Sequence, residues 1–417
     1  MNRTRRRAAA VVLALVLPLC ASTLARAAPS ATAVPAPDRA APSATAVPAP
    51  DRAATALQIP RPTGPFAVGR DIRHLVDDER RDPWVPTAGA RELMVSMYYP
   101  ARRDGSGTRA PYLTAAEAQA LLKSQQLEGV VDVERVTGTR TNARTGARPV
   151  DGTHPLVVLS PGFSLTRGTL TTLSEELASR GHVVALLDHA YESFGTSFPG
   201  GRTLTCVACD TVEAAPTDEA SRERLARAAA DRAADISFVV DELTERPAPG
   251  KRAFWRHAAM IDPRRVGAAG HSLGGNASAH AMTVDRRIRA GVNMDGTFFQ
   301  PVPATGLDGR PFLMLGTLEG HAPTSTDTTW PTTWAALDGW KRWLTVRDSG
   351  HFTFIDLPVL AAQLGITDPT APLPGDRSGE ITTSYVGAFF DQELRGVHQP
   401  LLDGPSAADP EVTFQNP

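Results

Sequence analysis

From about residue 57 onwards, short apolar runs alternate with stretches of helical periodicity, and this alternation constrains the fold more than any other feature. The first run alternates with polar residues and ends at Pro100, whereas the later runs are short and almost wholly apolar, as in strands that are buried on both faces. The runs cover residues 93–99, 156–159, 183–187, 266–269, 288–294, 312–315 and 343–346. We therefore predict an α/β fold, with a mostly parallel central sheet and helices on both faces.

Helical patterns fall between these runs. Leu170, Leu173 and Leu177 recur at helical spacing, and a second apolar face extends over residues 225–243 in a helix expected to begin at Thr217. Because no break in composition divides residues 57–417, we predict a single domain there.

Two segments are too long to be plain connections. Residues 112–153 begin as a helix and end as an Arg-rich stretch, and residues 191–216 form a long loop. Segments of this length are usually functional rims or covers, so we expect them to border a site and residues 112–153 to cover it.

The overall composition excludes several classes of protein. The chain has 417 residues, of which 42% are hydrophobic and 21% charged, with a formal net charge of -2. These values do not suit a disordered chain, a collagen or a multi-span membrane protein. A near-neutral charge balance also argues against a nucleic-acid partner, because nucleic-acid-binding proteins usually present a basic face.

Residues 1–27 have the pattern of an export signal. Four arginines within the first seven residues precede an uncharged apolar run over residues 8–24, and Ala25-Arg26-Ala27 is a small-x-small cleavage site. Alternatives are a single membrane anchor, a lipoprotein through Cys20, which the bulky Leu19 disfavours, and a twin-arginine export route. We expect a secreted protein without integral membrane association. Its mature charge is more negative than -2, since the signal carries five arginines and no acid.

Residues 28–56 predict a disordered tether. The thirteen residues 28–40 are repeated letter for letter as residues 41–53, and the repeated unit is rich in Ala and Pro without a large apolar side chain. Such a segment buries too little apolar surface to offset its chain entropy.

Cleavage of the signal leaves two cysteines, Cys206 and Cys209, in a Cys-x-x-Cys segment. In an exported chain these most simply form one structural disulfide. A zinc site would need further ligands, and a redox Cys-x-x-Cys normally lies between a strand and a helix, a setting that is missing here. We expect no metal.

The strongest chemical motif is Gly-His-Ser-Leu-Gly at residues 270–274. An apolar run precedes it at residues 266–269, and a helix-compatible stretch follows at residues 275–282. This strand–turn–helix is the nucleophile elbow of the α/β-hydrolase fold, in which the central Ser stands on a sharp turn at the carboxyl edge of the sheet. Ser272 is therefore the predicted nucleophile.

A Ser nucleophile needs a base and an orienting acid, which follow it in the order acid, then His. His351 lies in a loop directly after the predicted strand at residues 343–346, whereas His398 lies in the C-terminal tail and is expected at the surface. We predict that His351 is the base. For the acid, position alone leaves Asp295 and Glu319 open, because each follows a predicted strand.

Three other histidines are not assigned a catalytic role. His271 lies inside the elbow and is expected to pack or to form a hydrogen bond, while His280 and His321 are expected to be solvated or structural.

An oxyanion hole takes one backbone N–H from the residue after the nucleophile and another from the loop after an earlier strand. Leu273 supplies the first. The loop Ser160-Pro161-Gly162-Phe163 follows the run at residues 156–159, and we predict Phe163 as the second donor.

Several segments together resemble the plasma-type (isoform II) platelet-activating-factor acetylhydrolases and their bacterial relatives. The similar segments are residues 94–100, 159–163, 177–184, 270–274 and 292–296. This resemblance implies a Ser272, Asp295 and His351 triad with oxyanion donors at Phe163 and Leu273, and so favours Asp295 over Glu319. One departure is Pro161-Gly162, where animal members have His-Gly. That version also resembles bacterial cutinases and polyester hydrolases, whose acid would fall near Glu319.

We therefore expect a secreted serine ester hydrolase without a cofactor, since no cluster of His, Cys and carboxylate residues has the spacing of ligands. The resemblance implies that its substrates are short acyl esters, including those of phospholipids. One alternative is a lipase or cutinase-like polyester hydrolase, and another is a non-catalytic binding protein on a hydrolase scaffold. Phe298 and Phe299 follow Asp295 and either line the acyl pocket or pack in the core. The predicted partner is a small-molecule or lipid ester, and the oligomeric state stays open.

Overall fold

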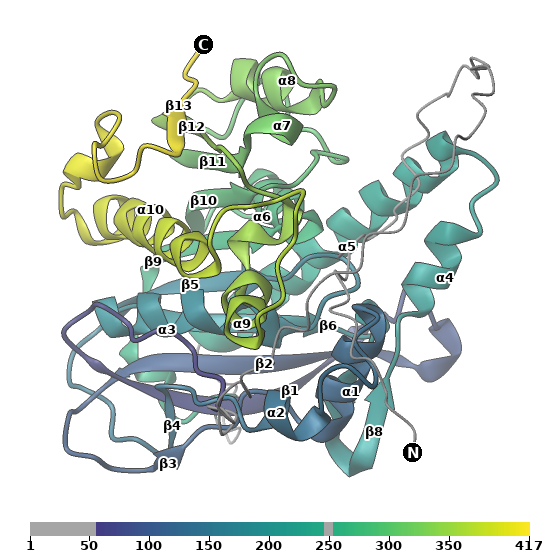
Figure 1. Cartoon of the computed structure of the whole chain (residues 1–417), viewed down its shortest axis with the longest axis vertical. Helices are drawn as coiled ribbons and strands as arrows, with labels where there is room; N and C mark the ends of the chain where they lie inside the picture. Colours follow the sequence, from purple (N-terminus) through teal and green to yellow (C-terminus); the bar gives the residue numbers. More distant parts are fainter. Residues whose placement is uncertain (1–55, 246–252) are drawn as a thin grey trace, which may run out of the picture.

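The computed structural model describes residues 56–245 and 253–417 (Figure 1). The predicted export signal and nearly all of the predicted tether lie outside these residues. Within the described part, one sheet has the strand order β13-β12-β11-β10-β9-β5-β6-β2-β1-β4-β3, and β7 and β8 form a separate hairpin. The strands are β1 (Ala67–Arg81), β2 (Ala90–Ala101), β3 (Thr108–Arg109), β4 (Arg144–Thr145), β5 (His154–Ser160), β6 (Val183–His189), β7 (Thr196–Phe198), β8 (Arg202–Leu204), β9 (Ile261–His271), β10 (Ile288–Met294), β11 (Phe312–Thr317), β12 (Lys341–Val346) and β13 (Val412–Phe414).

The predicted α/β fold is confirmed. Strands β6, β5, β9, β10, β11 and β12 are parallel neighbours, and each predicted apolar run lies within a strand. The sequence prediction missed β1, which pairs antiparallel with β2, because its many charged residues hide the strand pattern. The helices are α1 (Ala115–Ser124), α2 (Val133–Thr137), α3 (Thr171–Arg180), α4 (Val207–Glu213), α5 (Asp218–Thr244), α6 (Leu273–Val284), α7 (Leu318–His321), α8 (Thr329–Ala336), α9 (Asp356–Leu364) and α10 (Gly375–Arg395).

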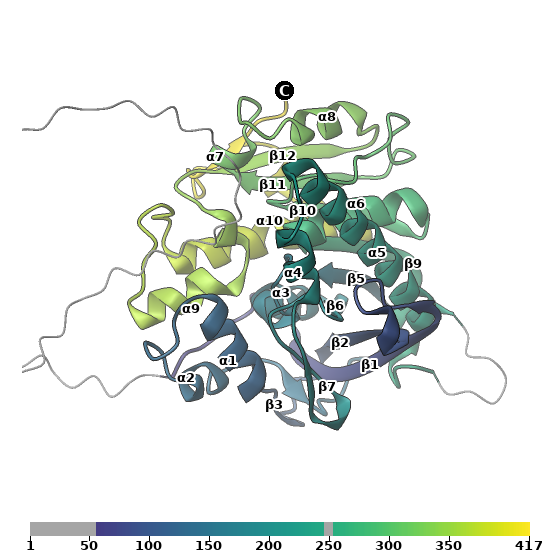
Figure 2. The same cartoon turned by 90° about the vertical axis from the view of Figure 1, so that its right-hand side faces the viewer.

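Side chains of the central strands alternate between two apolar clusters, one on each face of the sheet. In β5, Val158 packs with the α5 and α6 cluster, whereas its neighbour Val157 packs with the α3 and α10 cluster. Figure 2 shows α5 and α6 on one side of the sheet and α9 and α10 on the other. Burying one such side chain stabilises the fold by about 1.5–3 kcal/mol. The two-sided burial explains why these strands contain few polar residues.

Helix α5 begins where the sequence predicts. The Thr217 side chain accepts a hydrogen bond from the Ala220 amide, and Asp218 and Glu219 occupy the first turn. Both features stabilise a helix N-terminus, because they satisfy a free N–H group and complement the helix dipole.

The two long segments are ordered. In residues 112–153, α1 and α2 pack with α9 through an apolar cluster that contains Leu121, Val136 and Leu360. Residues 191–216 form β7, β8 and α4 instead of a plain loop, and the predicted Cys206–Cys209 disulfide is present with a Cα–Cα distance of 5.2 Å.

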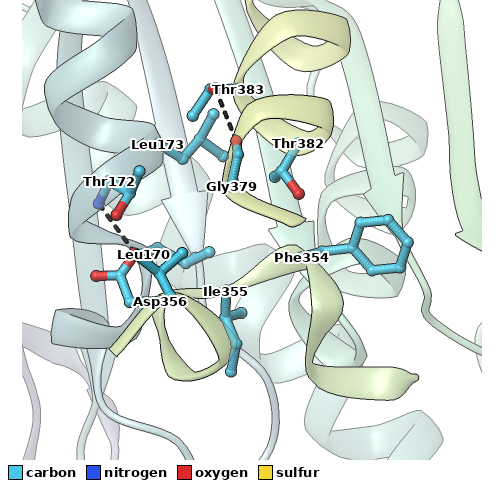
Figure 3. Close-up of a pocket in the computed structure, with 10 residues that line it drawn as sticks. Leu170, Thr172, Leu173, Phe354, Ile355, Asp356, Gly379, Thr382 and Thr383 are labelled. Carbon is cyan, nitrogen blue, oxygen red and sulfur yellow. Dashed lines mark hydrogen bonds between the residues drawn. The ribbon is translucent and has the colours of Figure 1, made fainter. Parts of the chain in front are cut away.

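A buried carboxyl group joins α3 to α9. Asp356, at the start of α9, accepts hydrogen bonds from the Thr171 and Thr172 amides at the N-terminus of α3 and from the Tyr112 hydroxyl. Figure 3 shows the bond between Asp356 and Thr172. Burial raises the pKa of Asp356 to about 7, because its hydrogen-bond donors carry no charge and the nearby Glu175 carboxyl disfavours a second negative charge.

None of the helices in residues 56–245 and 253–417 combines the length and the apolar character that a membrane span requires.

Candidate active site

Ser272 occupies the sharp turn between β9 and α6. Its backbone has φ 55° and ψ -126°, a strained conformation of the kind that is stored at functional sites. A Cβ atom on Gly270 would lie 2.2 Å from the Gly274 carbonyl carbon, and one on Gly274 would lie 2.1 Å from the Ser160 carbonyl oxygen. The turn therefore closes only because both flanking residues are glycines, as the motif predicts.

The structure brings Ser272, His351 and Asp295 into one chain of hydrogen bonds. His351 Nε2 lies 2.9 Å from Ser272 Oγ, and His351 Nδ1 lies 2.6 Å from Asp295 Oδ2. Asp295 follows β10, and His351 lies in the loop after β12. Because β9, β10 and β12 run parallel, their carboxyl ends meet at one edge of the sheet, and the three side chains converge there.

Asp295 is held as a carboxylate. Its Oδ1 accepts hydrogen bonds from the Thr317 amide at 2.7 Å and from His321 Nδ1 at 2.7 Å, while Oδ2 faces His351. Burial opposes the charge, but the contacts with His321 and His351 outweigh it and keep the pKa of Asp295 well below its usual range.

The sequence prediction treated His321 as a solvated or structural residue, and its contact with the Asp295 carboxylate was missed. The only feature of the sequence that could have indicated this contact was the position of His321, shortly after the strand that follows Asp295 and two residues after the alternative acid Glu319.

His271 supports the loop that carries His351. It is fully buried, and its Nε2 donates to the His351 carbonyl oxygen at 2.7 Å. Burial, together with the neighbouring His351, lowers the pKa of His271 to about 3, so this ring is neutral at physiological pH. The hydrogen bond agrees with the structural prediction for this residue.

Phe163 and Leu273 flank Ser272 from two different elements. Leu273 is the first residue of α6, where backbone N–H groups lack partners within the helix. Phe163 lies in the loop after β5, and it lines the pocket together with Ser272 and His351. Both residues that the sequence predicts as oxyanion donors therefore border Ser272.

The loop that carries Phe163 is anchored to buried charged residues. Arg232 of α5 donates to the Pro161 carbonyl oxygen at 2.6 Å, and the Ser164 amide donates to the Glu192 carbonyl oxygen at 3.0 Å. Arg232 also forms a 2.7 Å ion pair with the Glu192 carboxylate. Both residues are almost wholly buried, so this contact is screened little by water.

Further buried charges extend this support. Arg91 of β2 pairs with Asp82, Glu192 and Asp235, and the pKa of Asp235 lies well below its usual range because Arg91 and His189 outweigh its burial. The sequence prediction missed this network. A signal was present, since Asp235 adjoins Ile236 on the apolar face of α5 and a charge there needs a partner.

The pocket beside Ser272 is small and mostly apolar. Its lining residues are Gly162, Phe163, Ser164, Leu165, His271, Ser272, His351 and Phe352. None of these lies in residues 112–153, so the expected cover does not line the pocket, because that segment packs with α9 instead.

An apolar cluster continues from the pocket through Phe163. We call it the acyl-side cluster, and its members are Trp84, Phe163, Leu225, Ala228, Ala229, Leu273 and Phe299. Phe299 therefore packs in the same cluster as the pocket residue Phe163, whereas Phe298 is buried in the core against Phe312 and Trp330.

Other candidates lie apart from Ser272. Glu319 is exposed on α7, and His351 contacts Asp295 instead. His398 is exposed beside Asp403, as predicted for a surface residue. His280 pairs with Thr283 on α6. Among the described residues, no group of three or more His, Cys, Asp or Glu side chains suits a metal ion.

Comparisons with known proteins show which proteins this chain resembles. The family model for platelet-activating factor acetylhydrolase, isoform II, matches residues 52–200. A protein from Arthroderma benhamiae, described as a probable 1-alkyl-2-acetylglycerophosphocholine esterase, is 28% identical over 388 residues, which cover 85% of this chain and 93% of the relative. The solved structure of a ferulic acid esterase from Streptomyces cinnamoneus is 40% identical, with a TM-score of 0.73, and the match covers 86% of this chain and 99% of that one.

Proposed function

The chain is a carboxylic ester hydrolase that belongs to the isoform II platelet-activating factor acetylhydrolase family of α/β-hydrolases, and from this premise we propose that it is a secreted serine esterase. In this proposal Ser272 is the nucleophile, His351 the general base and Asp295 the acid that orients the base. One observation carries it: the unbroken chain of short contacts from Ser272 Oγ through the His351 ring to the Asp295 carboxylate.

The reaction proceeds through an acyl-enzyme. Ser272 Oγ attacks the ester carbonyl carbon while His351 Nε2 takes the hydroxyl proton, and the carbonyl oxygen becomes an oxyanion that accepts hydrogen bonds from the Phe163 and Leu273 amides. His351 then gives the proton to the leaving alcohol as the ester C–O bond breaks. Water repeats the sequence, frees the carboxylic acid and restores Ser272. Asp295 keeps the His351 ring in the required tautomer throughout.

For the substrate, we propose a short acyl ester. The acyl-glycerophosphocholine in the description of the Arthroderma benhamiae relative is one of the compounds to be tested. The small apolar pocket supports a short acyl group.

The acyl-side cluster favours a second candidate, an aromatic acyl group such as ferulate. Its rings Trp84, Phe163 and Phe299 offer apolar and stacking surface next to the nucleophile. The Streptomyces cinnamoneus relative, described as a ferulic acid esterase, supports the same candidate.

Labelling with a fluorophosphonate tests the mechanism. We expect one adduct on Ser272 in the folded protein, and we expect Ser272→Ala to abolish both labelling and turnover, with a loss of about 10⁴-fold or more. Ser406→Ala is the matched control and should label normally. An unlabelled Ser272 in the folded, parent protein would support the non-catalytic binding protein instead.

A substrate series tests the acyl group. The series comprises p-nitrophenyl esters of increasing chain length, methyl ferulate, 2-acetyl-glycerophosphocholine, a triglyceride and a polyester film. Phe299→Ala should lower kcat/KM for methyl ferulate more than for p-nitrophenyl acetate, because the acetyl group is too small to reach Phe299. Preferred turnover of the triglyceride or the polyester film would favour the lipase or cutinase-like alternative.

Secretion rests on the basic cluster, the apolar run and the Ala25-Arg26-Ala27 site. Sequencing the N-terminus of protein collected from the culture medium should give a chain that begins at Ala28. An uncleaved protein retained in the membrane fraction would support the single-anchor alternative.

A further inference from the structure

His321 lies on the side of Asp295 that faces away from His351. The two histidines share one carboxylate: His321 Nδ1 is 2.7 Å from Oδ1, and His351 Nδ1 is 2.6 Å from Oδ2. The other ring nitrogen of His321, Nε2, lies 3.4 Å from the Asp327 carboxylate. A row of alternating groups therefore extends from the nucleophile through His351, Asp295 and His321 to Asp327.

Only the protonated form of His321 suits both neighbours. A neutral imidazole has one N–H donor and would turn a lone pair towards one of the carboxylates, whereas the imidazolium donates from both nitrogens. Burial opposes the charge, but Asp295 and Asp327 outweigh it and raise the pKa of His321 to about 9. His321 is thus a cation at neutral pH.

The surroundings fix this ring in place. The Trp330 ring stacks on it at a centroid distance of 4.2 Å and an angle of 28°, and Trp343 Nε1 donates to the His321 carbonyl oxygen at 2.8 Å. Asp327 is itself held by the Thr297 and Thr329 hydroxyls.

The charged groups that face His321 come from two elements. They are Asp295 at the end of β10 and Asp327 before α8, while α8 and β12 contribute the neutral indole rings of Trp330 and Trp343. No other described charge contributes to holding the proton on His321 as strongly as these two carboxylates.

We propose that His321 is a positioning residue: a protonated imidazole that fixes the Asp295 carboxylate against His351 and sets the pH range in which the base is free. This inference rests on the proposed roles of Ser272, His351 and Asp295. With a cation already bound to Oδ1, Asp295 attracts a proton on His351 less strongly, so the base stays free at lower pH. The same cation keeps Oδ2 directed at the His351 ring.

Removing the charge while keeping the donor gives a sharp test. His321→Asn retains an N–H donor near the position of Nδ1 but no charge, and Asp327→Asn leaves His321 in place with one carboxylate partner. We expect the acidic limb of the kcat/KM profile to move to higher pH by about one unit in His321→Asn and by less in Asp327→Asn. His398→Asn, an exposed histidine with its own carboxylate neighbour, is the matched control and should leave the profile unchanged.

A rate loss without movement of the acidic limb in both variants would show a merely structural role and would overturn the proposal. If His321→Asn does not fold, Asp327→Asn decides alone.

Histidine NMR separates this inference from the proposed mechanism. The ring signals of His321 in the parent protein are those that disappear in a folded variant without His321 or that shift in Asp327→Asn. At pH 8 these signals should still be those of an imidazolium. A neutral ring at pH 7 would contradict the proposal whatever Ser272 does. Conversely, an imidazolium at pH 8 together with full turnover by Ser272→Ala would contradict the mechanism and leave the charge on His321 established.

Discussion

Two aspartates of this protein are almost equally buried, yet their pKa values are shifted in opposite directions. Asp295 in the hydrogen-bond chain with Ser272 and Asp356 at the α3–α9 junction are 3% and 1% exposed, and both accept backbone N–H hydrogen bonds. The pKa of Asp295 nevertheless lies well below its usual range, whereas burial raises the pKa of Asp356 to about 7.

The difference comes from the charge of the neighbours. Asp295 contacts two imidazole rings, and His321 carries a positive charge. Asp356 contacts amide groups and the Tyr112 hydroxyl, and these neutral donors do not outweigh its burial and the nearby Glu175 carboxyl. Burial and hydrogen bonds alone therefore do not keep a carboxylate ionised here, whereas a nearby cation does.

The largest expected effect follows from removing the charge of Asp295. Asp295→Asn keeps the size of the side chain but disturbs the tautomer of His351, so kcat should fall by about 10³- to 10⁴-fold. Steady-state kinetics on a p-nitrophenyl ester measure this change. Glu319→Gln is the matched control and should retain full turnover. Near-full turnover in Asp295→Asn together with a loss in Glu319→Gln would assign the acid to Glu319.

A smaller effect is expected on stability at the second carboxyl. Because folded Asp356 binds its proton up to about pH 7 and unfolded Asp releases it near pH 3.8, stability falls as the pH rises between these values. The shift corresponds to a loss of about 4 kcal/mol. The Asp356→Asn variant has no group that titrates at this position, so it should not lose this stability as the pH rises.

Denaturant unfolding of the parent protein and of Asp356→Asn at pH 5 and pH 8 measures the difference between their free energies of unfolding. The free energy of unfolding of Asp356→Asn minus that of the parent should increase with pH, since other titrating groups cancel. A difference that does not change with pH would mean that Asp356 is ionised in the folded protein.

The smallest effect is expected from the neutral partner of Asp356. Tyr112→Phe removes one hydrogen bond to the buried carboxyl group and should cost about 1 kcal/mol. Thermal unfolding measures the loss, and kcat/KM for a short acyl ester should not change, because Tyr112 does not line the pocket at Ser272. An equal loss of activity would mean that the α3–α9 junction and the site are coupled.

Local patterns in the chain were enough to predict the sheet and the elbow. Buried strands such as β5 and β6 appear as short apolar runs because both faces are covered, and Gly270 and Gly274 mark a turn that admits no side chain at either position. His351 could also be predicted, since it follows a strand in the order that the fold requires. Strand β1 could not, because its polar residues hide the pattern.

Contacts between distant residues could not be predicted in this way. The amino-acid sequence by itself determined the α/β fold, the position of Ser272 and a short set of partners for it, because these depend on spacing along the chain. Only the tertiary structure decided that Asp295 and not Glu319 touches His351, that His321 shares that carboxylate, and that Arg232 holds the Pro161 loop. Each of these depends on which side chains meet across the sheet edge, and ionisation depends on the charge of those neighbours.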